Sequence, residues 1–169
     1  MKALHRGARL LAAAAVLAGC FPSDPARVHP VAVRTTSSGE VEVLLVPCSP
    51  VLISRFEVTD PQEAFQSADD PRVWQVDFSP PATDLHRVTL GQVPPGGNEQ
   101  VPWPSAGLDS RDPDKNYVVR VVLDNGGYWY QGFDQRHLTE GRILFRDRSI
   151  SPEAFAEQSR CPDPTGEAG

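Results

Sequence analysis

The stretch YVVRVVLDNGGYWYQGF, residues 117–133, predicts two antiparallel strands joined by a tight turn. Asn125-Gly126 at its centre can adopt the positive φ angles of a type I′ turn, which suits the twist of a β-hairpin. A two-residue turn there would place Leu123 opposite Tyr128. Because cross-strand partners share a face, one side of this hairpin is expected to be apolar and to face a core. That side would consist of Val119, Val121, Leu123, Tyr128 and Tyr130.

The opposite side of the hairpin combines aromatic and polar residues, among them Arg120, Trp129 and Phe133. A further tryptophan, Trp103, lies in the proline-rich loop PPGGNEQVPWP at residues 94–104. Aromatic and arginine side chains are enriched at binding hot spots, so these four residues form a candidate binding face. The competing interpretation, which we favour, is packing: a second sheet covers the hairpin face, and the loop tryptophan caps the core.

Short strands separated by proline and glycine continue on both sides of the hairpin. We expect them at residues 41–46, 51–58, 73–78, 87–90 and 141–145. In the second of these, alternation places Leu52, Ser54, Phe56 and Val58 on one face. In the third, Trp74, Val76 and Phe78 would point inward. Seven or eight strands of this kind predict an all-β protein, an antiparallel β-sandwich of the immunoglobulin or fibronectin class.

Helix is expected in two short places. Ser151 as an N-cap and Pro152 at the first helical position predict a short C-terminal helix that ends before Cys161. Residues 62–68 are a second candidate for one or two helical turns.

Residues 1–20 differ in character from the rest of the chain. Lys2, Arg6 and Arg9 form a basic start without acidic residues, and residues 10–18 form a continuous apolar run. Nine helical residues span about 14 Å, whereas a bilayer core requires roughly 20 residues. A basic start, a short apolar run and small residues at its end are typical of a secretory signal peptide.

The end of this run, Leu17-Ala18-Gly19-Cys20, resembles the lipobox of bacterial lipoproteins. The resemblance covers only the first 20 of the 169 residues. It implies cleavage before Cys20, a diacylglycerol on the Cys20 sulfur and a fatty acid such as palmitate on the freed amine. Each buried methylene contributes about 0.8 kcal/mol, so two or three chains hold a protein on a membrane. The implied location is the extracytoplasmic face of the cell membrane or outer membrane. An ordinary signal peptide is the alternative.

Composition divides the chain into a signal peptide (1–19), a proline-rich tether (20–30), one domain (31–161) and an unstructured tail (162–169). Removing residues 1–19 takes away three of the 16 Lys and Arg and none of the 22 Asp and Glu. The remaining chain therefore carries a net charge of about −9. Nucleic acids and anionic lipid surfaces both favour positively charged proteins, so we expect neither as a partner of the folded domain.

Cys48 and Cys161 remain once Cys20 is assigned to the lipid. An exported protein meets an oxidising compartment, and two cysteines form one disulfide. Closing so long a loop stabilises a protein by about 4–5 kcal/mol in the chain-entropy model. Two free thiols or a metal-binding pair are the alternatives. Neither CxxC nor HxxH occurs, and we expect no metal and no cofactor.

Motifs for catalysis are scarce. The sequence contains no GxSxG elbow, HExxH, Walker loop or GxGxxG loop. His86 and His137 are the histidines of the expected domain, and either could serve a small hydrolase with Asp84 or Asp134. The D-x-D-x-N pattern at 112–116 lacks the glycine and the glutamate of a calcium loop, so we interpret it as an acidic turn.

These observations favour a non-catalytic, lipid-anchored protein of the cell envelope over an enzyme. Its partner would be an envelope protein, a glycan or a small ligand, or the protein would support an envelope assembly. Antiparallel sandwiches present loops and faces for binding, although a fold does not fix a function. A small extracytoplasmic hydrolase and a purely structural lipoprotein stay open as alternatives.

Overall fold

The structure, a computed structural model, describes residues 30–62, 69–108 and 112–161. The predicted signal peptide with Cys20, the tether up to residue 29 and the C-terminal tail lie outside these residues. So does nearly all of the helix expected at 62–68. Among the described residues, none of the helices has the length and the apolar character needed to cross a bilayer.

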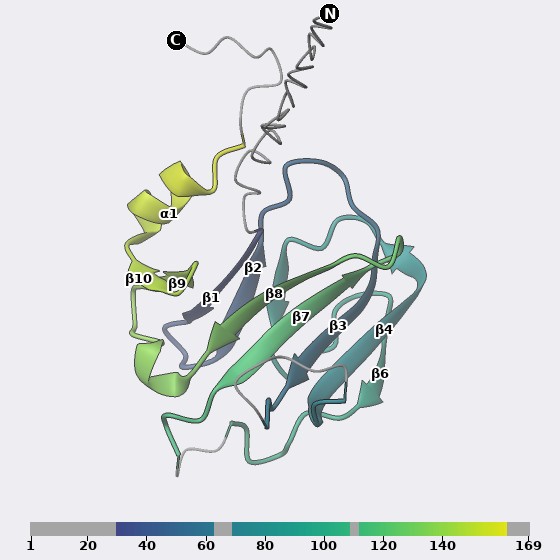
Figure 1. Cartoon of the computed structure of the whole chain (residues 1–169), viewed down its shortest axis with the longest axis horizontal. Helices are drawn as coiled ribbons and strands as arrows, with labels where there is room; N and C mark the ends of the chain where they lie inside the picture. The colour runs from purple at the N-terminus through teal and green to yellow at the C-terminus, as the bar shows by residue number, and fades with distance from the viewer. Residues whose placement is uncertain (1–29, 63–68, 109–111, 162–169) are drawn as a thin grey trace, which may run out of the picture.

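Two antiparallel five-stranded sheets pack face to face, which confirms the predicted β-sandwich (Figure 1). The first sheet consists, in spatial order, of β10 (Arg148–Ile150), β9 (Ile143–Phe145), β1 (Val31–Thr35), β2 (Val41–Leu45) and β5 (Arg87–Thr89). The second sheet consists of β6 (Gly97–Val101), β4 (Arg72–Ala82), β3 (Ile53–Thr59), β7 (Tyr117–Leu123) and β8 (Tyr128–Phe133). A short 3₁₀-helix, η1 (Gln135–His137), and one α-helix, α1 (Pro152–Gln158), complete the described part of the fold.

The core lies between the two sheets and follows the alternation of the strands. On β4, Trp74, Val76 and Phe78 point inward as predicted, and none of the three is more than 5% exposed. Trp74 packs edge-on against Phe56 of β3, with the ring centroids 5.6 Å apart. Burying a large apolar side chain contributes about 1.5–3 kcal/mol, so these inward-facing positions dominate the stability of the fold.

The β7–β8 hairpin forms as predicted, but its register is shifted by one residue. Gly126 is the last residue of the turn and has a φ angle of +82°. Its N–H donates to the Leu123 carbonyl at 3.0 Å. The Leu123 N–H donates in turn to the Gly127 carbonyl at 2.8 Å. The loop therefore has three residues, Asp124 to Gly126, rather than two.

This shift reverses the predicted faces of β8, because a one-residue slip moves every side chain to the other side of a sheet. Val121 faces Trp129 rather than Tyr130. Phe133 is buried in the core at 2% exposure, whereas Tyr128 and Tyr130 are 57% and 45% exposed on the outer face. The predicted apolar side of the hairpin was thus right for β7 and wrong for β8.

A bulge in β3 corrects a second predicted face. The pairing of β3 with both neighbours shifts between Ile53 and Arg55, so the alternation changes phase there. Ile53 consequently joins Phe56 and Val58 in the core, and Leu52 is 47% exposed. An extra residue in one strand re-aims the side chains that precede it.

Helix α1 confirms the predicted C-terminal helix and covers the outer face of the first sheet. The Ser151 hydroxyl accepts a hydrogen bond from the Ala154 N–H at 3.2 Å, the N-cap arrangement expected from the sequence. Phe155 packs edge-on against Phe145 of β9, with the centroids 5.2 Å apart. Ala32 and Ile143 complete this small second core.

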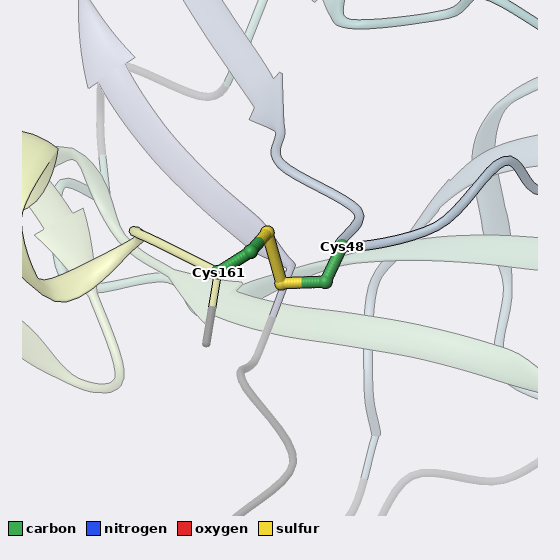
Figure 2. Close-up of a disulfide and its surroundings, with 2 residues drawn as sticks. All are labelled: Cys48 and Cys161. Atoms are coloured by element: carbon green, nitrogen blue, oxygen red, sulfur yellow. A yellow bond between two sulfur atoms is a disulfide. The ribbon is translucent and has the colours of Figure 1, made fainter. Parts of the chain in front are cut away.

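The disulfide between Cys48 and Cys161 is present, as predicted (Figure 2). Cys48 lies in the loop after β2, and Cys161 lies just beyond α1. Their Cα atoms are 5.2 Å apart although the two residues are separated by 113 positions. The bridge therefore ties the segment that follows α1 to the loop that follows β2.

The sandwich has two dissimilar ends. We call one the bridge end, because the disulfide, the start of β1 and the end of α1 lie there (Figure 1). At this end the Val46 N–H donates to the Pro30 carbonyl at 2.8 Å. We call the opposite end the loop end. It contains the β1–β2 turn (36–40), the described parts of the long β6–β7 connection (102–108 and 112–116) and η1.

Candidate functional site

A hollow of about 400 Å³ opens at the loop end of the sandwich. Its described walls come from the β1–β2 turn, the end of β5, the β6–β7 connection and the η1 segment. They consist of Thr35, Gly39, Glu40, Val41, Leu90, Trp103, Gly107, Leu108, Gln135 and Leu138. Four segments that are distant in sequence thus converge on one mixed apolar and polar site, which we call the loop-end hollow.

Trp103 both packs against the core and lines the loop-end hollow. Its ring lies edge-on to Trp74, with the centroids 5.9 Å apart. The Glu99 carboxylate accepts from the Trp74 indole N–H at 2.7 Å and from the Trp103 backbone N–H at 3.3 Å. These contacts hold the loop in place. The Trp103 side chain is half-buried, and it both packs against the core and lines the hollow.

Gly91 is required beside Trp103. A Cβ at this position would lie 2.7 Å from Cδ1 of the Trp103 ring, and the φ angle of Gly91 is +81°. Both the close approach and the left-handed backbone favour glycine there. The ring is therefore fixed on one side by Gly91 and on another by Trp74.

Glu40 supplies the charge of the loop-end hollow. Its Oε1 accepts from the Gln92 side-chain amide at 2.7 Å, and its Oε2 accepts from the Ser38 hydroxyl at 2.8 Å. Both donors are neutral. Within the described residues, no arginine, lysine or histidine forms an ion pair with this carboxylate. Glu40 is also the only charged side chain among the described walls.

A second, larger hollow of about 820 Å³ lies on the other side of the same loop and shares Gly107 and Leu108 with the first. Its charged residues are already engaged: Lys115 pairs with Asp60 at 2.8 Å, and Arg72 pairs with Glu57 at 3.3 Å. The loop that carries Trp103 therefore separates two hollows of different electrostatic character.

The four residues of the predicted binding face do not form one face. Phe133 is buried beside Tyr117, with the ring centroids 5.8 Å apart, and Trp129 is half-buried against the core. Arg120 lies on the opposite face of the second sheet and pairs with the buried Glu57. Trp103 belongs to the loop end. The one-residue shift in β8 is the physical reason why Trp129 and Phe133 lie on the face opposite Arg120.

The outer face of the second sheet carries instead an aromatic pair that the sequence interpretation placed in the core. The rings of Tyr128 and Tyr130 are 6.3 Å apart, and the Arg120 guanidinium lies 6.0 Å from the Tyr128 ring centre. Such pairs contribute modestly at exposed sites. Interpreting Asp124-Asn125-Gly126 as a three-residue loop would have found this pair, because glycine is the usual third residue of such loops.

The two candidate catalytic histidines lie at opposite ends of the sandwich. The Asp134 carboxylate is 2.7 Å from Nδ1 of His137, and it also accepts from the His137 backbone N–H at 2.9 Å. His86 is exposed near the bridge end, where its carbonyl accepts from Leu45. The small hollow beside His137 has no serine, threonine or cysteine among its described walls.

Asp134 can orient the His137 ring, but no nucleophile stands beside it in the part of the chain that the structure describes. Across residues 30–62, 69–108 and 112–161, no group of three or more His, Cys, Asp or Glu side chains is placed to hold a metal ion.

We compared the chain with models of protein families, with curated proteins and with solved structures, and none of them matches it.

Proposed function

We propose that this protein is a lipid-anchored protein of the cell envelope that binds a partner at its loop end without catalysing a reaction. The observation that carries this proposal is that the chain enters the domain at one end of the sandwich and the hollow lies at the opposite end. The chain enters β1 beside the Cys48–Cys161 bridge, and the loop-end hollow lies at the other end of the sandwich.

The disulfide supports the extracytoplasmic location. Disulfides persist in oxidising compartments outside the cytoplasm and are rare inside it. The chain has three cysteines, and the bridge uses two of them. Cys20, at the end of the lipobox-like segment, is then left as the attachment point for the lipid.

The geometry of the two ends supports an outward-facing hollow. Residues 20–30, between the proposed lipid and β1, would reach up to roughly 30 Å in an extended, proline-rich conformation. An anchor that joins the domain at the bridge end leaves the loop end free to face away from the membrane. The loop-end hollow would then be accessible to an envelope protein, a glycan or a small ligand.

The first test concerns the anchor. We expect intact-mass spectrometry of the protein purified from native membranes to give a chain that begins at Cys20 and carries diacylglycerol. Replacing Cys20 by alanine should release the protein from the membrane fraction, whereas Cys48→Ser should leave it there. A native chain that begins elsewhere, or that bears no lipid, would overturn the anchor.

The second test concerns the loop end. A photo-crosslinking amino acid at Leu138, in the wall of the loop-end hollow, should capture a defined partner in native cells. The same amino acid at the exposed Leu52, near the bridge end, is the matched control. Capture at position 52 but not at position 138 would overturn binding at the loop end.

A second candidate function is hydrolysis by His137, and its contact with Asp134 supports it. A carboxylate at Nδ1 leaves Nε2 to accept a proton from a water molecule. If the protein is a hydrolase, His137→Ala and Asp134→Asn should cause the same phenotype in the native host, and His86→Ala should not. A normally folded His137→Ala protein with the wild-type phenotype would leave this candidate without support.

A further inference from the structure

We infer that the occupant of the loop-end hollow is an organic cation on a short aliphatic stem, that is, an alkylammonium or alkylguanidinium group. This inference rests on the proposed binding function of the loop end and names the chemistry of its ligand. The same chemistry belongs to a lysine or arginine side chain of a partner protein and to a free small amine.

The charge of the hollow favours a cation. Glu40 is the only charged group among the described walls, and the two groups that hold its oxygens, Gln92 and Ser38, are neutral. Glu40 is exposed, so a ligand beside it removes only part of the water around the carboxylate, and a compensating charge on the ligand offsets that loss. A cation provides that compensation, whereas a neutral group does so only in part and an anion is repelled.

The remaining walls favour an aliphatic stem beside the charge. Val41, Leu90, Leu108 and Leu138 supply branched apolar side chains, and Trp103 supplies an aromatic surface. Methylene groups gain from burial against such walls, and a cation near a tryptophan face gains a further attraction. Thr35 and Gln135 add neutral polar groups that can orient the ligand.

The size of the hollow fits one such group. Its volume of about 400 Å³ lies near the lower end of the range for ligand pockets, roughly 300–1,000 Å³. A single extended side chain or a small amine enters such a space with room left for water, whereas a helix or a strand does not enter it. The acidic character of the whole chain, with 22 Asp and Glu against 16 Lys and Arg, would also attract cations to it.

Glu40 is held ready for this function by its neighbours. The backbone N–H of Glu40 donates to the Thr36 hydroxyl at 3.1 Å, and the Thr36 hydroxyl lies 2.8 Å from the Ser38 hydroxyl. The carboxylate is therefore oriented before a ligand arrives, which lowers the entropic cost of binding.

The test uses three small probes of equal length: n-butylammonium, n-butanol and butyrate. They are titrated into the full mature protein while the NMR signal of the Trp103 indole N–H is followed, with Trp103→Phe identifying that signal. We expect saturable shifts with butylammonium, weaker shifts with butanol and none with butyrate. Equal binding of butylammonium and butanol, or no binding of any probe, would overturn the inference.

Two variants separate the charge from the shape of the hollow. Glu40→Gln keeps the length and an acceptor oxygen, and we expect it to weaken butylammonium binding about fivefold and to leave butanol binding unchanged. Glu140→Gln is the matched control, because this residue lies at the same end but not among the walls of the loop-end hollow. An unchanged butylammonium affinity in a folded Glu40→Gln protein would overturn the role of Glu40 and with it the inference.

A fourth probe distinguishes the two sources of the cation. N-acetyl-lysine methylamide should bind more tightly than butylammonium if the natural occupant is a side chain of a partner protein, and more weakly if it is a free amine. Either result supports a cation in the hollow, provided that both bind.

Binding of the probes does not depend on the lipid. A native protein that is found to bear no lipid but binds butylammonium would therefore overturn the anchor alone. A lipidated protein that ignores butylammonium would overturn the occupant alone.

Discussion

At the bridge end the chain is held by a covalent bond and by backbone hydrogen bonds, whereas at the loop end the side chains of four separate segments surround an open hollow. Cys48 and Cys161 fix the bridge end, and the Val46 N–H adds a bond to the Pro30 carbonyl. Trp103 organises the loop end by packing against Trp74. The difference indicates a division of labour, in which one end gives stability and the other remains accessible. Four predictions test this division, in order of expected effect.

The largest effect is expected at the bridge end. Replacing both Cys48 and Cys161 by serine should lower the free energy of unfolding by about 4–5 kcal/mol, because the bridge closes a loop of 113 positions. Urea denaturation monitored by tryptophan fluorescence measures the loss. Reduced wild-type protein is the control and should show a similar loss. An unchanged urea midpoint in the variant would mean that the bridge end does not depend on its covalent bond.

The second prediction compares substitutions at the two ends of β8. Phe133 ends β8 at the loop end and is 2% exposed, whereas Tyr128 begins β8 toward the bridge end and is 57% exposed. Phe133→Ala should destabilise the protein by about 3–5 kcal/mol, and Tyr128→Ala by no more than about 0.5 kcal/mol. The same denaturation measurement applies. The register first expected from the sequence places Tyr128 in the core and so predicts a large loss for Tyr128→Ala, which makes this variant decide between the two registers.

A third prediction concerns the support of Trp103. Gly91→Ala would place a methyl group against the ring at 2.7 Å, on a backbone with φ +81°. Gly96→Ala is the matched control, since its φ angle is +76° and nothing lies within 4 Å of the added methyl. We expect Gly91→Ala to destabilise the protein by about 1–3 kcal/mol more than Gly96→Ala, owing to overpacking.

The same pair of variants also reports on the hollow. Gly91→Ala should shift the Trp103 indole signal, because the ring must move to accept the methyl group, and Gly96→Ala should not shift it. Equal stability and equal spectra in both variants would show that the close contact at Gly91 does not hold the loop end.

The smallest effect is expected in α1, which begins toward the loop end and is tied by the disulfide near its end. The backbone N–H of Glu153 and the Ser151 hydroxyl donate to the Glu153 carboxylate, and these bonds lower the pKa of Glu153 below its ordinary value of 4.5. A lowered pKa in the folded state means that the carboxylate stabilises the helix above about pH 4.5. This contribution disappears as the pH falls through the lowered value.

Amide exchange at Ala154 and Phe155 can detect this small change. Exchange should accelerate below pH 4.5 relative to that at the end of α1, after correction for the intrinsic pH dependence. Glu153→Gln should abolish this additional acceleration. A wild-type profile that coincides with the Glu153→Gln profile would argue against the proposed hydrogen bonds.

Local sequence patterns predicted the structure correctly where a pattern is compatible with a single local conformation. Ser151 followed by Pro152 predicted the start of α1, and the structure has the same N-cap. The alternation from Trp74 to Phe78 predicted the buried face of β4 correctly. The pairing of Cys48 with Cys161 also followed from counting once Cys20 had been assigned to the lipid, because the two remaining cysteines allow only one bridge.

Predictions from sequence patterns were wrong where the same residues are compatible with two backbone conformations. Asp124-Asn125-Gly126 is compatible with a two-residue or a three-residue loop, and the choice decides which side of β8 is buried. The bulge before Arg55 likewise cannot be inferred from alternation, since a bulge interrupts it. In both cases the sequence pattern placed aromatic or aliphatic side chains on the wrong side of a strand. In the first case, the hairpin residues of the predicted binding face consequently lie on different faces of the sheet.

The loop-end hollow could not be predicted from the sequence, although Trp103 was singled out. Its walls come from residues as distant as Thr35 and Leu138, and only the packing of the two sheets brings them together. Glu40 belongs to no recognisable motif, because a single glutamate in a turn is common in proteins. Its significance depends on the hollow that it lines together with distant apolar residues.

The sequence by itself determined the all-β class, the C-terminal helix and the partner of each bridging cysteine, and it predicts the lipid attachment at Cys20. These features depend on local preferences or on counting, which the order of residues contains directly. The tertiary structure alone decided the strand registers, the faces of β3 and β8, and the hollow opposite the bridge. Those features depend on which distant segments share a surface, and that choice is made by the free energy of packing the whole domain.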